Sequence, residues 1–377
     1  MQFNMAGFGA SGWVLALSLC ATPLHAGEIV VGQVAPLSGL DANQGRAYGV
    51  GMQLAFRNAN KGTGINGNTL VLARKDDAGN PEATLRLTRE LLDQDKAVVL
   101  AGYFGIGSIE AVARSGVLEK EPVALVGWRA AQIRPETVNL FNVRASLRDE
   151  IFKVTEHLGT VGITRLGIVY EQGPGGLQLM SSAGEAAQKA RASVVGMASW
   201  PAGTTSVQQA VQAMLKVQPQ AVMMVGSGAS AAAFVDQYRK AGGTAQLFAN
   251  DGVDMEQLGA KLDDAQMSGI SIAQAVPSPY KISSRIAKEF VDTVARSEKL
   301  EVPVSYAMME GFIAGKVVVE AIRRQGKTPS RQGTIDALGK MEYFDMGGYS
   351  VAYQPNIRAG SRFVELTILG GKGRIRQ

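Results

Sequence analysis

Cysteine and histidine are almost missing from this sequence, which excludes much active-site chemistry. Among 377 residues the cysteine is Cys20 and the two histidines are His25 and His157. Zinc sites built on cysteine and histidine, and a Ser-His-Asp triad, therefore have almost nothing to work with. His157 falls near the end of a helical pattern, where an imidazolium suits the helix dipole. We predict that the protein is not an enzyme and has neither a catalytic residue, a cofactor nor a metal.

Long apolar runs are also missing, and the one apolar stretch predicts export. Residues 12–21 are almost all apolar or small, too short a run to span a bilayer but typical of a secretory signal. We predict a signal peptide over residues 1–26, cleaved after Ala26, and a periplasmic product. Lipid anchoring at Cys20 is disfavoured because the preceding Leu19 is not small. The alternative is a protein that is not exported and buries an N-terminal helix.

Charge of one sign does not accumulate anywhere along the chain. There are 38 Lys and Arg against 33 Asp and Glu, a net charge of +5, and no basic run predicts nucleic acid as a partner. About 350 residues follow the predicted leader, which is long for one hydrophobic core and comfortable for two domains.

Short apolar runs alternate with helical patterns over most of the length. Runs without polar alternation are typical of parallel strands that helices cover on both faces. We expect strands at 28–35, 69–74, 97–101, 122–127, 165–170, 193–199, 220–225, 246–249 and 268–274, with a terminal strand region at 361–369. We expect helices at 44–60, 81–95, 108–119, 148–158, 176–191, 206–217, 229–241, 284–297 and 305–324.

These elements form two βα series in tandem, which predicts an α/β fold of two doubly wound parallel-sheet lobes. We expect lobe one over 27–143 plus 278–356 and lobe two over 144–277 plus 357–377, joined by a hinge that the chain crosses several times. This arrangement places a cleft between the carboxyl ends of two sheets, where small ligands bind.

Two glycine-containing turns follow expected strands and open expected helices. Residues 226–231 read G-x-G-x-x-A, with Asp251 at the end of the next strand. A dinucleotide site is disfavoured because this motif lies in the second series. In residues 102–108 the glycines let a ligand approach the backbone and the helix N-terminus favours an anion. A tight turn capped by Ser108 is the equal alternative. Trp128 follows another strand and either lines the cleft or packs at a core edge.

The order and spacing of many short segments resemble one protein family over essentially the whole chain after the leader. These segments are 32–39, 58–60, 64–67, 76–81, 141–146, 305–307 and 310–311. The chain is similar to the leucine/isoleucine/valine-binding branch of the periplasmic solute-binding proteins of ABC transporters. The resemblance implies the type I two-lobed fold and a clamp that is not an enzyme.

The resemblance also implies where a ligand would bind. It places at Asp251 the acid that meets the ligand ammonium, whereas Ile106 and Ala130 replace the family's hydroxyl residues for the ligand carboxylate. Backbone N–H groups near Gly107 and Ser108, or Arg129, would then hold that carboxylate. The predicted ligand-binding residues are Ser38, Gln44, Phe104, Ser108 and Trp128 in lobe one and Tyr170, Ser227 and Asp251 in lobe two.

The predicted function is that of the extracytoplasmic solute-binding component of an ABC importer. The expected ligand is an amino acid, branched-chain or otherwise apolar, and the expected partners are the membrane permease subunits; we expect a monomer. Two alternatives stay open: a ligand-sensing receptor or regulator with the same fold, and a clamp for aromatic or aliphatic carboxylates or amides.

Overall fold

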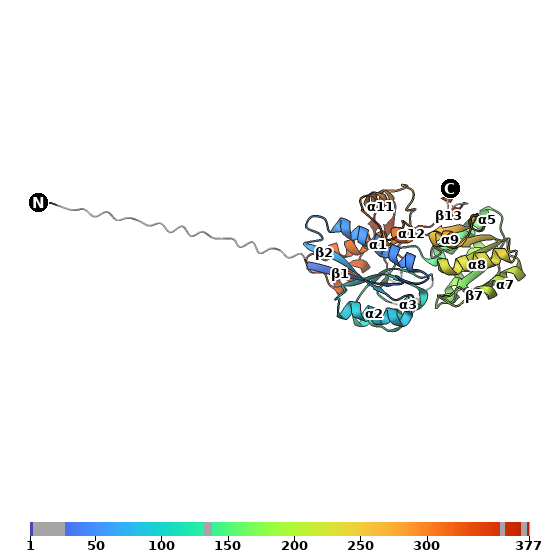
Figure 1. The fold of residues 1–377 in the computed structure, drawn as a ribbon, viewed down its shortest axis with the longest axis horizontal. Helices are drawn as coiled ribbons and strands as arrows, with labels where there is room; N and C mark the ends of the chain where they lie inside the picture. The colour runs from blue at the N-terminus through green and yellow to red at the C-terminus, as the bar shows by residue number, and fades with distance from the viewer. Residues whose placement is uncertain (3–26, 132–137, 355–358, 371–374, 377) are drawn as a thin grey trace.

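The computed structural model describes residues 1–2, 27–131, 138–354, 359–370 and 375–376. Apart from residues 1–2, the predicted leader lies outside this part of the chain. The remainder forms two α/β lobes side by side, each built on a twisted sheet with helices packed against it (Figure 1). This arrangement confirms the predicted fold class of two doubly wound, parallel-sheet lobes.

The sheet of lobe one is parallel throughout its described strands. Its order is β2 (Asn68–Asp76), β1 (Gly27–Ala35), β3 (Val99–Phe104), β4 (Leu125–Arg129) and β5 (Leu140–Phe141). The helices between these strands are α1 (Ala42–Ala59), α2 (Pro81–Asp93), α3 (Ile106–Arg114) and α4 (Val117–Lys120). Strands β3 and β4 are buried along their whole length, as expected for strands that are covered on both faces.

Helix α12 (Tyr306–Arg323) returns to lobe one and packs along α1. Glycine is needed where the two helices meet. A Cβ on Gly51 would lie 2.0 Å from the carbonyl oxygen of Met308, and one on Gly311 would lie 2.1 Å from that of Tyr48. The missing side chains thus let the two backbones approach closely. Helices α11 (Arg285–Ala295) and α13 (Arg331–Gly339) flank α12, and the short strands β11 (Phe344–Asp345) and β12 (Ser350–Val351) follow.

The sheet of lobe two is larger and mixed. Its described strands run in the order β14 (Ile375–Arg376), β13 (Glu365–Leu369), β10 (Ser271–Gln274), β9 (Gln246–Ala249), β8 (Ala221–Val225), β6 (Arg165–Glu171) and β7 (Ser193–Trp200). Strands β6 to β10 are parallel, whereas β13 pairs antiparallel with β10. The helices are α5 (Leu147–Thr160), α6 (Gly176–Lys189), α7 (Gln208–Val217), α8 (Gly228–Lys240), α9 (Met255–Lys261) and α10 (Asp264–Met267).

The chain passes between the lobes after β5, after β10 and after β12, and these crossings lie together. The hydroxyl of Tyr349 lies 2.8 Å from the carbonyl oxygen of Val143 and 3.1 Å from that of Ala275. The backbone N–H of Ser361 donates to the carbonyl of Arg144 at 3.5 Å. The hydroxyl of Tyr349 and the backbone hydrogen bond from Ser361 to Arg144 thus connect all three crossings in one hinge region. The predicted lobe boundaries at 143/144, 277/278 and 356/357 stay a prediction.

Every expected strand overlaps an observed one, but some helices differ. The expected helix 108–119 is two helices, because Gly116 interrupts it with a φ of +65°. Helices α9 and α13 and the β11–β12 pair were not anticipated. Helix α9 is only seven residues long, too short for a clear periodic pattern. Within the described residues, no helix is both long and apolar enough to cross a membrane.

Candidate interlobe binding site

The carboxyl ends of the two parallel sheets face each other and are joined by direct hydrogen bonds. Arg129 ends β4 of lobe one, and Asp251 follows β9 of lobe two. The Nη2 atom of Arg129 donates to the carbonyl oxygen of Asp251 at 2.7 Å. This places the contact at the edge of a doubly wound sheet where small molecules bind.

Five buried charged residues surround this contact and form what we call the hinge cluster: Arg129, Arg144, Glu150, Asp251 and Glu310. Arg144 lies in the first crossing and donates from Nη1 to Oδ2 of Asp251 at 2.7 Å. Arg129 pairs with Glu310 of α12. Glu150 of α5 accepts the backbone N–H of Asp251 at 2.6 Å. The cluster therefore joins the two lobes through the hinge.

Local sequence explains how Glu150 reaches the cluster. Ser146 and Asp149 form a capping box, each side chain accepting from the other residue's backbone N–H. Such a box fixes where a helix begins, so α5 starts soon after Arg144. Glu150 then lies in the first turn, where a carboxylate is favoured by the helix dipole.

Burial and the two guanidinium groups set the protonation of the hinge cluster. Burial raises the pKa of Glu150 to about 8, against the lowering by Arg144. Burial lowers the pKa of Arg144, but Glu310 and Asp251 outweigh this effect and the pKa is raised. The pKa of Arg129 is raised in the same way by Glu310 and Asp251, so both arginines are charged at neutral pH. Burial also raises the pKa of Glu310, against the lowering by Arg129 and Arg144.

Two carboxylate oxygens of the hinge cluster accept no hydrogen bond within the described residues: Oε1 of Glu310, which lies 3.9 Å from Nε of Arg144, and Oδ1 of Asp251. The Oδ2 atom of Asp251 is held by Arg144. A buried carboxylate oxygen without a donor is unfavourable by a few kcal/mol. Oδ1 of Asp251 is thus oriented by its neighbour and open to a donor that the protein itself does not supply.

A second contact between the lobes involves neutral amides, and we call it the clasp: Gln257 of α9 with Leu40, Asp41 and Gln44 of lobe one. Nε2 of Gln257 donates to the carbonyl oxygen of Leu40 at 2.7 Å and lies 3.3 Å from Oδ1 of Asp41. Oε1 of Gln257 accepts from Nε2 of Gln44 at 3.0 Å. Gln44 in turn accepts from Nε of Arg129 at 3.0 Å, which connects the clasp to the hinge cluster.

Several predicted ligand-binding residues lie at this junction. Gln44 and Asp251 are part of the two contacts between the lobes. Phe104 is buried at the end of β3, where it pairs in register with Arg129. Ser227 precedes α8 and donates to Glu171 at 3.2 Å. Their contact with a ligand stays a prediction.

Other predicted residues point elsewhere. The hydroxyl of Ser108 lies 2.7 Å from Oγ1 of Thr84, inside lobe one. Trp128 packs in a core cluster of lobe one, and Tyr170 packs against a core cluster of lobe two. The side chain of Ser38 is exposed, and its backbone N–H lies 3.3 Å from Oδ1 of Asp76. A ligand role for these four residues also stays a prediction.

Sequence reasoning missed Glu310, Arg144, Glu150 and Gln257 as members of the interlobe contacts. The sequence around Glu310 could have pointed to it, because Glu310 is the one charged residue between Tyr306 and Gly315, a stretch of α12 that is buried throughout. A buried carboxylate requires a partner. Nothing comparable pointed to Gln257, since a glutamine in a short polar helix is usually exposed.

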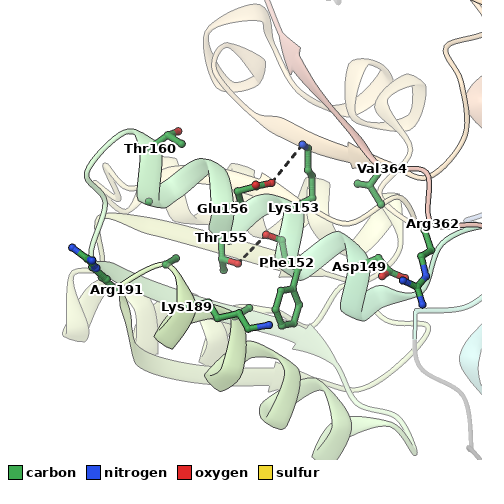
Figure 2. A pocket seen from close by; sticks show the side chains of 13 residues that line it. Asp149, Phe152, Lys153, Thr155, Glu156, Thr160, Lys189, Arg191, Arg362 and Val364 are labelled. Carbon is green, nitrogen blue, oxygen red and sulfur yellow. Dashed lines mark hydrogen bonds and ion pairs between the residues drawn. The ribbon is translucent and has the colours of Figure 1, made fainter.

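A cavity of about 790 Å³ lies away from this junction, between α5 and α6 and beside β13 (Figure 2). Phe152 lies inside it, with Nζ of Lys189 4.8 Å from the ring centroid. Lys153 and Glu156 form an ion pair at 3.6 Å on its wall. None of the predicted ligand-binding residues lines this cavity. No group of three or more metal-binding side chains occurs among the residues that the structure describes.

Comparison with known proteins agrees with this architecture. The solved substrate-binding periplasmic protein from Ralstonia solanacearum is 34% identical, with a TM-score of 0.84, over 92% of this chain and 99% of the other. The isoleucine complex of a branched-chain amino acid transporter substrate-binding protein from Streptococcus pneumoniae has a TM-score of 0.76 over 93% of this chain and 98% of its own. At 17% identity, it shows a shared fold alone.

Curated relatives align over shorter stretches. The "Amino acid binding protein" of Pseudomonas aeruginosa is 35% identical over 95 residues, 24% of this chain and 25% of the relative. The Leu/Ile/Val-binding protein BraC3 of Rhizobium johnstonii is 34% identical over 113 residues, 29% of this chain and 31% of the relative. The aligned segments thus span about a quarter to a third of these relatives. A model of the periplasmic binding protein family matches residues 28–364. The chain therefore belongs to the periplasmic binding protein family, which confirms the resemblance found in its sequence.

Proposed function

We propose that the protein is the periplasmic solute-binding component of an ABC importer and that it closes its two lobes on an amino acid. The observation that carries this proposal is Asp251, whose Oδ1 is buried at the junction of the lobes without a protein donor. A ligand ammonium supplies the N–H donors that this oxygen requires. Membership in the family and the names of the curated relatives support the same class of ligand.

The opposite end of the amino acid would meet lobe one. Helix α3 begins after Gly105, whose backbone N–H donates to the carbonyl of Arg129 at 2.9 Å, and its first turn contains no acidic residue. A helix N-terminus of this kind favours a carboxylate. Arg129 is already engaged with Gln44, Glu310 and Asp251, so we assign the ligand carboxylate to the N–H groups of α3 and an apolar side chain to the wall at Phe104.

Closure around the ligand requires that it contacts both lobes, because a ligand shifts a conformational equilibrium only by its difference in affinity for the two states. Asp251 and α3 belong to different lobes and satisfy that condition. The closed complex would then deliver the amino acid to the membrane permease. A shift in the melting temperature of the exported protein tests the ligand class, because ligand binding to the folded state stabilises it by mass action.

The panel contains leucine, isoleucine and valine, and, as matched acids without the amino group, 4-methylpentanoate and benzoate. We expect the melting temperature to rise with at least one amino acid and to rise much less with the acids that lack the amino group. Asp251→Asn, which keeps the size of the side chain, is expected to abolish the preference for the amino group. A shift only with the acids would contradict the ammonium contact and favour the alternative carboxylate clamp; an unchanged preference in Asp251→Asn would contradict the role of Asp251.

A further inference from the structure

In the clasp, the side chain of Gln257 in lobe two reaches the backbone of lobe one at Leu40. Gln257 is 9% exposed. Its own backbone N–H is held by Asp254 at 2.8 Å, the cap of α9. The amide is thus aimed by a fixed helix start, and it engages Leu40, Asp41 and Gln44 across the interface.

The orientation of both amides in the clasp is determined by their neighbours. The carbonyl oxygen of Leu40 can only accept, so the nitrogen of Gln257 must face it. Arg129 can only donate, so the oxygen of Gln44 must face Arg129. The remaining atoms, Nε2 of Gln44 and Oε1 of Gln257, then form a donor–acceptor pair at 3.0 Å. Reversing either amide would place two donors or two acceptors together.

The backbone of lobe two leaves space for this arrangement at Gly228, the first residue of α8. A Cβ at this position would lie 2.3 Å from Oε1 and 3.1 Å from Cβ of Gln257. Real Cβ atoms do not approach other atoms as closely as the first of these distances. An alanine at Gly228 would therefore displace the side chain of Gln257, to which the three atoms nearest to its Cβ belong.

We propose that Gln257 is a positioning residue that holds the cleft closed without ligand and so sets how tightly the ligand is retained. This inference rests on the proposed function only for the identity of the ligand. The contact between the lobes involves residues of the protein alone. Each neutral hydrogen bond contributes only a small net stabilisation, because water replaces it when the lobes open. The clasp therefore biases the equilibrium toward the closed state.

Single-molecule energy transfer on the unliganded protein tests this role. The full chain with Cys20 replaced by serine has no other cysteine, so Asp93→Cys on α2 and Gln212→Cys on α7 place one dye on an exposed site of each lobe. The distributions are compared for the labelled parent, Gln257→Ala and Gly228→Ala. Gln266→Ala is the matched control, because its amide bonds to Asp236 at 2.8 Å within lobe two.

We expect a closed population in the unliganded parent and a closed-to-open ratio at least roughly fivefold lower in both test variants, the change for one lost bond; Gln257→Ala removes up to three. The apparent dissociation constant for leucine should rise by the factor by which the closed fraction falls, with the control within about twofold of the parent. A parent that is wholly open without ligand, or a Gln257→Ala distribution equal to that of the control, would overturn the inference. If leucine does not bind but the unliganded distributions shift as expected, the clasp stands and the proposed ligand fails.

Discussion

The two contacts between the lobes differ in chemistry, and this difference predicts different roles for them. The hinge cluster consists of buried charges, and removal of one partner leaves another charge unpaired inside the protein. The clasp is built on two neutral amides, with one further contact from Gln257 to the Asp41 carboxylate at 3.3 Å. Hydrogen bonds of the amides exchange for water at little net change in free energy. The hinge cluster is therefore expected to stabilise the fold, and the clasp to set how often the cleft opens.

The largest expected effect is the loss of a charge from the hinge cluster. Arg144→Met leaves Asp251 without its 2.7 Å partner, and the free energy of unfolding should fall by about 3–5 kcal/mol. Urea denaturation measures this change. The matched control is Arg148→Met, because Arg148 pairs with Glu185 at 2.8 Å on the surface with half of its side chain exposed; its effect should stay below about 1 kcal/mol. Similar losses in both variants would refute the distinction between buried and exposed pairs.

A smaller effect is the pH dependence that Glu150 gives to stability. Burial raises its pKa to about 8 in the folded protein, above the ordinary value of 4.5. A raised pKa means that the folded state holds the proton more tightly, so this contribution to stability is complete below about pH 4.5 and is lost as the pH rises through 8. Glu150→Gln should remove this decline, which runs from about pH 4.5 to about pH 8.

Unfolding curves across that pH range test the expectation. Glu156→Gln is the control, since Glu156 lies on the same helix with 72% of its side chain exposed. Its pH profile should match that of the parent. If Glu150→Gln retains the full decline, then Glu150 is not protonated in the folded protein.

The clasp should give the next effect, and here the two amides are expected to act together. Gln44→Ala and Gln257→Ala each remove one side of a 3.0 Å hydrogen bond. A double-mutant cycle on the closed-to-open ratio should show a coupling of about 0.5–1 kcal/mol. Neither variant should change the free energy of unfolding as much as Arg144→Met. A coupling near zero would mean that the two side chains bind to their other partners independently.

The smallest expected effect on leucine affinity is at Ser108. Its hydroxyl lies 2.7 Å from Thr84 and 3.4 Å from Asp77 inside lobe one. Ser108→Ala should therefore lower the free energy of unfolding by about 1 kcal/mol and leave leucine affinity within twofold. A tenfold or larger loss of affinity at unchanged stability would instead return Ser108 to the predicted ligand contacts.

The sequence predicted elements whose pattern is local and missed contacts that depend on distant segments. The buried strands and amphipathic helices were predictable because burial repeats along the chain. Asp251 was singled out because it follows an expected strand, and the resemblance to the binding-protein family gave it its role and added Gln44 to the predicted site. The direction of the Ser108 side chain was not predictable, because its partners Thr84 and Asp77 come from other segments of the chain. The clasp could not be predicted either, since its two glutamines are 213 residues apart in the sequence.

Calorimetric titration of leucine, isoleucine and valine into the parent protein and into Gln257→Ala tests the account most directly. We expect one amino acid bound per chain in the parent and a dissociation constant that is higher in the variant by the factor by which its closed fraction is lower. Binding of none of the three amino acids to the parent, or equal affinity in both proteins, would contradict it.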